Sequence, residues 1–149
     1  MMRYEAELNG VARRVDDLEQ LHRLLEEVRQ ADQTRLYIRQ INGEMAGFER
    51  FLYKMLGITT VIEGKNAMLL TRGAVSTLIF GDEAGHELRV LQKNGDGASG
   101  GDVTFDLGDG SVAIHCAKEC LSRDEAMRAI EGFYVTGKPP SWLTYHQTR

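Results

Sequence analysis

The stretch that decides the fold is residues 120–149, which begin C-L-S-R-D-E-A-M-R-A-I-E-G-F-Y-V-T-G-K-P-P-S-W-L-T-Y. Ser122 is the predicted N-cap of a helix. Glu125 stands three residues later, at the spacing of a capping box, in which each residue satisfies a backbone N–H group of the other. Apolar residues then recur at intervals of three and four, which predicts one buried helix face. These residues are Ala126, Ala129, Ile130 and Phe133.

Three residues predict where this helix ends. Gly137 suits the left-handed conformation that closes many helices. Pro139 and Pro140 prevent continuation, because proline has no backbone N–H and restricts the residue before it. A short extended piece, residues 141–145, follows and carries three large side chains that can lie back on the body of the protein: Trp142, Leu143 and Tyr145.

Length and charge limit the class of protein. The chain has 149 residues, which predicts a single domain, residues 1–149, able to bury a core without a disulfide or a metal. The net charge is −4, whereas nucleic-acid binders usually carry a basic excess, so we predict no direct contact with nucleic acid. A mild acidic excess also suits a protein that meets a basic partner.

The sequence also predicts a cytoplasmic protein that does not cross a membrane. Its N-terminus, M-M-R-Y-E-A-E-L-N, lacks the apolar core of a signal peptide. No stretch approaches the roughly 18 uninterrupted apolar residues that a membrane span requires. The two cysteines, Cys116 and Cys120, do not form a disulfide framework, which is consistent with a reducing compartment.

The first thirty residues predict a strand and a helix. Residues 4–8 alternate apolar and acidic side chains, as a half-buried strand does, and an Asn-Gly turn follows. Residues 16–29 predict an amphipathic helix with Asp16 as its N-cap and Glu19 at the capping-box position. Its apolar stripe is Leu18, Leu21, Leu25 and Val28, with Leu24 beside it.

The middle of the chain predicts strands separated by turns. Glycine-rich turns bound five runs of strand character, residues 34–41, 59–63, 67–71, 76–80 and 87–91. The segment 44–56 is ambiguous. Its apolar spacing fits a short helix, which we favour, but three aromatic residues close together could also form a strand: Phe48, Phe51 and Tyr53.

Residues 102–116 predict a β-hairpin around a tight turn at Asp109-Gly110. In the first strand, Val103, Phe105 and Leu107 alternate with polar residues. In the second strand we expect the apolar residues to face inward. These are Val112, Ile114 and Cys116, which leaves Ser111, Ala113 and His115 on the opposite side.

Together these elements predict an α+β fold. We expect one curved, mostly antiparallel sheet with an N-terminal and a C-terminal helix packed on one face.

The chain lacks the sequence patterns of common catalytic and metal sites. A zinc deaminase would need H-x-E followed by P-C-x-x-C, and no C-x-x-C is present. His115, Cys116 and Cys120 could offer three metal ligands, but a buried free cysteine usually behaves as a small apolar residue. Calcium-loop, P-loop and nucleophile-elbow spacings also fail. We therefore predict no catalytic residue, no metal and no cofactor.

The C-terminal phrase A-x-x-A-I-x-x-F-Y-x-T-G-x-P-P-x-W-L, residues 126–143, resembles the C-terminal signature of immunity protein family 1 of bacterial polymorphic toxin systems. Two earlier parts are similar to that family in the same order. One is the helix opening at Val15, Asp16, Asp17, Leu18 and Leu21, and the other is the hairpin pattern at Val103, Phe105, Leu107 and Gly110.

The resemblance implies a non-enzymatic protein that binds one cognate toxin domain, often a nucleic-acid deaminase, and blocks its active site. Because a toxin that acts on nucleic acid needs a basic groove, exposed acidic residues are candidates for the contact. These are Asp82, Glu83, Asp96, Asp106 and Asp109, and each of them could instead be a solvated turn residue.

Two further possibilities stay open. Trp142 and Tyr145 could form part of a binding surface, or they could seal the edge of the core beside Phe133. The alternative function is a small-molecule-binding or regulatory α+β domain, with its pocket lined by the aromatic residues of the segment 44–56.

Overall fold

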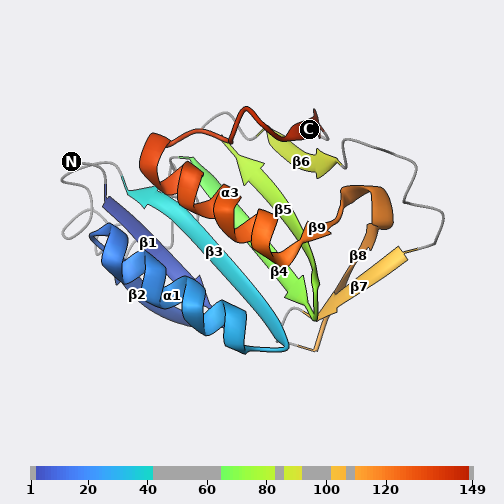
Figure 1. The fold of residues 1–149 in the computed structure, drawn as a ribbon, viewed down its shortest axis with the longest axis horizontal. Helices are drawn as coiled ribbons and strands as arrows, with labels where there is room; N and C mark the ends of the chain where they lie inside the picture. Colours follow the sequence, from blue (N-terminus) through green and yellow to red (C-terminus); the bar gives the residue numbers. More distant parts are fainter. Residues whose placement is uncertain (1–2, 42–64, 83–85, 92–101, 107–109, 148–149) are drawn as a thin grey trace, which may run out of the picture.

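The computed structural model describes residues 3–41, 65–82, 86–91, 102–106 and 110–147, and within them the fold is α+β, as predicted. All strand pairs in the main sheet are antiparallel, and its order is β10-β6-β5-β4-β3-β1-β2, with β9 paired to β5 beside this path (Figure 1). Its strands are β1 (Arg3–Leu8), β2 (Val11–Val15), β3 (Gln33–Ile41), β4 (Asn66–Arg72), β5 (Val75–Gly81), β6 (Glu87–Leu91), β9 (Leu121–Ser122) and β10 (Thr144–Gln147).

Two helices cover one face of this sheet, as predicted (Figure 1). They are α1 (Leu18–Gln30) and α3 (Arg123–Thr136). Alternate residues of the central strands point at them, because side chains of a strand alternate between the two faces. The core between helices and sheet includes Ala6, Leu36, Ile38, Leu69, Leu78 and Phe80 from the strands and Leu21, Leu25, Val28, Ile130 and Phe133 from the helices.

A hairpin covers part of the other face. Its strands, β7 (Asp102–Asp106) and β8 (Val112–Cys116), form a two-stranded sheet of their own, so the single predicted sheet is wrong on this point. A second apolar cluster holds the hairpin against β4. Its buried members are Leu70, Phe105 and Cys120, with Met68, Val103 and Ala113 packed against them.

The predicted inward face of β8 is wrong. Phe105 is buried and pairs with Ala113, so Ala113 and the buried His115 lie on the inner side of the hairpin. Val112 and Ile114 are 56% and 60% exposed. A strand has a period of two, so the pairing partner of one buried residue determines the side of every other residue. Hydropathy alone predicts the opposite side, because valine and isoleucine are the more apolar pair.

The first predicted helix begins later than expected. Strand β2 occupies the residues before it and pairs with β1 across the Asn9-Gly10 turn, whose φ angles are 51° and 87°. Asp17, rather than Asp16, is the N-cap, and its Oδ1 accepts a hydrogen bond from the Gln20 N–H at 2.8 Å. Residues 11–14 of β2 are all exposed, on both faces of the strand. The sequence V-A-R-R-V therefore lacks the alternation of apolar and polar residues that predicts a strand.

The C-terminal helix agrees closely with the prediction. Ser122 is its N-cap, where Oγ accepts from the Glu125 N–H at 3.2 Å and donates to the Glu125 carboxylate at 2.9 Å. Gly137 is left-handed and its N–H donates to Phe133 O at 2.7 Å. The strand that follows begins at Thr144, so Trp142 lies in the preceding turn and not in an extended piece. The predicted elements at 44–56 and 59–63 lie outside the described residues.

Replacing Gly137 by alanine is expected to lower the free energy of unfolding by about 1–2 kcal/mol, because its φ of 71° is unfavourable for a residue with a Cβ. Gly132→Ala is the matched control inside α3. There a Cβ would meet Pro140 Cγ at an ordinary 3.5 Å, and alanine is favoured over glycine by about 0.8–1.0 kcal/mol. Urea denaturation of both variants measures the two changes, and a shift of the same sign in both would contradict the assignment.

Candidate functional site

The predicted acidic residues do not gather in one place. Asp82 follows the last residue of β5, whereas Asp106 ends β7. The Arg72 guanidinium donates to Thr104 O at 3.0 Å, which places this end of β7 near the start of β5. A seven-residue strand spans roughly 20 Å, so Asp82 and Asp106 lie at opposite ends of β5. The other three candidates, Glu83, Asp96 and Asp109, lie outside the described residues.

Asp82 is bound to His86 by several hydrogen bonds. Its Oδ1 accepts from the His86 N–H at 2.9 Å, its Oδ2 lies 3.0 Å from His86 Nδ1, and its own N–H donates to His86 O at 3.2 Å. These contacts link the residue after β5 to the residue before β6. They favour the second interpretation of Asp82, that of a solvated turn residue, over a role in binding a partner.

The two C-terminal aromatic residues behave differently from each other. The Tyr145 ring meets Phe80 edge to face at 5.8 Å, and Phe80 lies 5.5 Å from Phe133. The Tyr145 hydroxyl donates to Pro140 O at 2.6 Å, and burial raises the pKa of this hydroxyl. Tyr145 therefore seals the edge of the core, whereas Trp142 keeps 38% of its surface exposed.

The outer side of the hairpin combines apolar and acidic residues. We call it the hairpin face and define it by Asp102, Thr104, Asp106, Val112 and Ile114, which the strand alternation places together. Asp106 pairs with Val112 and Thr104 pairs with Ile114. Both aspartates are exposed, as are the valine and the isoleucine. Of the predicted contact residues that the structure describes, Asp106 belongs to this face.

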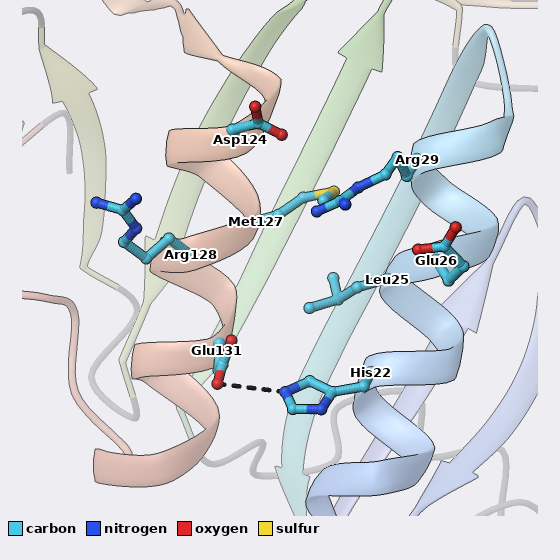
Figure 2. A pocket seen from close by; sticks show the side chains of 8 residues that line it. All are labelled: His22, Leu25, Glu26, Arg29, Asp124, Met127, Arg128 and Glu131. Atoms are coloured by element: carbon cyan, nitrogen blue, oxygen red, sulfur yellow. Dashed lines mark ion pairs between the residues drawn. The ribbon is translucent and has the colours of Figure 1, made fainter.

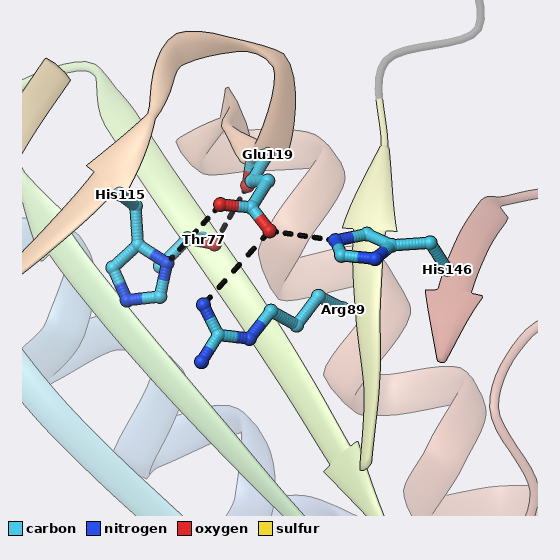
Figure 3. Close-up of polar contacts among 5 residues, drawn as sticks. All are labelled: Thr77, Arg89, His115, Glu119 and His146. Carbon is cyan, nitrogen blue, oxygen red and sulfur yellow. Dashed lines mark hydrogen bonds and ion pairs between the residues drawn. The ribbon is translucent and has the colours of Figure 1, made fainter. Parts of the chain in front are cut away.

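A cluster of polar side chains lies between the hairpin and the main sheet, and we call it the Glu119 cluster (Figure 3). The Glu119 Oε2 atom lies 2.7 Å from His146 Nε2 of β10 and 3.9 Å from Arg89 Nη1 of β6. Because a carboxylate accepts only, the His146 nitrogen is the donor. Glu119 belongs to the short helix η3 (Ala117–Glu119), and its backbone oxygen accepts from Thr77 Oγ1 at 2.6 Å.

His115 completes this cluster from β8. Its Nδ1 lies 3.9 Å from Glu119 Oε1 and has no hydrogen-bond partner among the described residues. The ring packs edge to face on Phe105 at 5.8 Å. Burial lowers the pKa of His115, the positive charge of Arg89 lowers it further, and Glu119 opposes both effects. The geometry therefore favours a neutral imidazole beneath the hairpin.

The Glu119 cluster connects the chain segment after β8 to the main sheet. Glu119 is engaged by two basic groups at once, and no set of three or more His, Cys, Asp or Glu side chains in the described part of the chain could hold a metal ion. Sequence analysis missed the cluster because its members are far apart along the chain and His115 was expected on the outer side. The signal that could have placed that histidine is the pairing of Phe105 with Ala113, because His115 lies two residues after Ala113 and so faces the same side.

A groove of about 480 Å³ lies between α1 and α3 on the helical side (Figure 2). Leu25 and Met127 lie within it, and His22 Nε2 pairs with Glu131 across it at 3.3 Å. The remaining lining residues carry charges of both signs: Glu26, Arg29, Asp124 and Arg128. Opposite charges at short range cancel, so this groove presents no field of one sign to a partner.

Comparison with known proteins finds no matching protein-family model and no similar curated protein. The resemblance to immunity protein family 1 therefore rests on the residues quoted above. Neither described helix has the length and apolar character that crossing a membrane requires.

Acidification is expected to destabilise the protein through His115. The pKa of this histidine is lowered in the folded state, so below about pH 6.5 the unfolded chain takes up a proton more readily and unfolding becomes more favourable. The His115→Leu variant should lose this contribution, and its free energy of unfolding should fall less steeply than that of the wild type between pH 7.5 and pH 5.5. Urea denaturation across this range measures the slopes, and identical slopes would contradict the assignment.

Proposed function

We propose that this chain is an immunity protein. It binds a cognate toxin domain of the nucleic-acid deaminase class in the cytoplasm, one to one, and blocks the toxin's active site without chemistry of its own. The proposal starts from the resemblance of residues 126–143 and of the two earlier motifs to immunity protein family 1. It is supported by the nature of the hairpin face.

The exposed pair Val112 and Ile114 is the observation that carries the proposal. Their exposed fractions are 56% and 60%, so more than half of the surface of each residue stays in water, and burying its apolar part against a partner would be favourable. Single exposed apolar side chains are common, but here two β-branched residues lie two positions apart on one strand and face the same way. Such a pair suits the core of a protein interface, which is more apolar than its rim and poor in charged residues.

The charges around this pair indicate the kind of partner. Asp102 and Asp106 lie on the same face, and the whole chain has a net charge of −4. A toxin domain that acts on nucleic acid must present a basic groove to the phosphate backbone. Acidic side chains placed on such a groove increase the association rate and compete with the substrate for the same cations.

The face also presents a strand for recognition. In the described part of the chain, β7 and β8 pair with no strand except each other. The Thr104 carbonyl of β7 already accepts from the Arg72 side chain, so the edge of β8 is the better candidate for a further strand. An extended segment of a partner can add to such an edge, with main-chain hydrogen bonds giving affinity and side chains giving specificity. The hairpin therefore combines a main-chain and a side-chain basis for binding.

The central test is titration of the purified protein with the toxin domain encoded beside it. Tight one-to-one binding and loss of toxin activity are expected. Val112→Ser and Ile114→Ser should each raise the dissociation constant roughly tenfold or more, because the apolar contact is lost. Val135→Ser is the matched control, since Val135 is 66% exposed on α3, and it should leave affinity unchanged. Equal effects at all three positions would remove the hairpin face from the interface.

Charge reversal tests the electrostatic part separately. Asp106→Lys should slow association several-fold at low salt, and the difference should shrink as salt shortens the screening length from about 10 Å at 0.1 M to about 3 Å at 1 M. Asp16→Lys makes the same charge change at an exposed site in the β2–α1 connection and is the control. Stopped-flow kinetics measures both, and an association rate that is equal in the two variants would contradict a basic surface opposite the hairpin.

A further inference from the structure

The hairpin is not part of the main sheet, so side chains must determine its orientation. Strands in one sheet are positioned by ladders of backbone hydrogen bonds, but β7 and β8 form such ladders only with each other in the described residues. The apolar contacts around Phe105 attach the inner side of the hairpin to β4. Such contacts are non-directional, and they leave the angle of the hairpin to be set by something more specific.

The Glu119 cluster supplies directional contacts at one end of the hairpin. Glu119 lies three residues after the end of β8, in η3, which joins the hairpin to the rest of the chain (Figure 3). Its carboxylate meets His146 on β10 and Arg89 on β6, and its backbone oxygen meets Thr77 on β5. One residue thus connects the base of the hairpin to three strands of the main sheet.

We propose that Glu119 is the positioning residue that holds the hairpin face in its binding orientation. The part that concerns toxin affinity rests on the proposed function, whereas the part that concerns the hairpin is independent of it. The charged and titratable groups around the carboxylate include Arg89, His115 and His146 of the described residues. The negative charge therefore has basic groups on several sides.

The charge of Glu119 matters more than its volume. Its side chain is only 13% exposed, so water screens these contacts weakly. A glutamine at this position would have nearly the same shape and would keep one oxygen acceptor, but it would lose the negative charge that attracts Arg89 and strengthens the hydrogen bond from His146. A variant with this single change separates the positioning role from simple packing.

The test is hydrogen exchange of the free protein, comparing Glu119→Gln with Glu131→Gln. Glu131 also pairs with a histidine, His22, but on the helical side of the sheet, so it is a matched control. Amides of residues 102–106 and 112–116 should exchange about ten to a hundred times faster in Glu119→Gln, the size expected for a lost hydrogen bond to a charged group. They should be unchanged in Glu131→Gln. Unchanged exchange in Glu119→Gln would overturn the proposal.

A double-mutant cycle adds a measurement that a packing role would not affect. His146→Gln on the edge strand β10 should also accelerate hairpin exchange, and the double variant with Glu119→Gln should be less affected than the product of the single effects. Strictly multiplicative effects would show that the two residues do not act together and would overturn the proposal.

Toxin titration then distinguishes the two proposals. If Glu119→Gln accelerates exchange and weakens toxin binding about as much as the hairpin-face variants do, both proposals stand. If exchange accelerates while binding by all variants, including Ile114→Ser, is unaffected, the hairpin is positioned by Glu119 but is not the toxin site. If the wild type binds through Ile114 and exchange is unchanged in Glu119→Gln, the function stands and the positioning role is overturned.

Discussion

The rest of the structure depends on the burial of strand β4 on both of its faces. Ala67 and Leu69 pack under the two helices, while Met68 and Leu70 pack under the hairpin. A strand covered on both sides carries a nearly continuous apolar run, which explains the consecutive A-M-L-L residues at positions 67–70. Because β4 is a central strand with apolar side chains on both faces, each face has to be covered by another layer of structure. The helices supply one layer, and the hairpin has to supply the other.

This constraint gives the hairpin its two unlike sides. The inner side must match β4 and carries Val103, Phe105 and Ala113. The outer side remains exposed and carries valine, isoleucine and aspartate residues. The polar Glu119 cluster lies outside the apolar contact with β4. It joins the segment after β8 to β6 and β10. Packing, attachment and the proposed binding surface therefore belong to one element, and each depends on the same alternation along β8.

The sequence predicted the parts that depend on neighbours in the chain. The cap at Ser122, the stop at Gly137 and the periodic apolar faces of both helices are local signals, and the structure confirms them with two exceptions at the first helix. Its N-cap shifts by one residue, and Leu18 of the predicted stripe is exposed. The prediction failed at β2 and at the inner face of β8. At β2 the sequence shows no apolar alternation, and at β8 the apolar Val112 and Ile114 favour the wrong side. In both cases the assignment depends on which strand lies alongside.

The candidate site divides in the same way. Asp106 was predicted as a contact residue because acidic turn residues can be recognised in the sequence, and that prediction stays open. Val112 and Ile114 were placed in the core because they are apolar. The Glu119 cluster could not be predicted, since its residues come from β5, β6, β8, η3 and β10 and meet only after folding. Thus the sequence by itself determined the α+β class, the helices and their caps, because these follow from local backbone preference and periodicity. Only the tertiary structure decided which side of the hairpin is exposed and what anchors it, because strand sides are set by pairing partners distant in the chain.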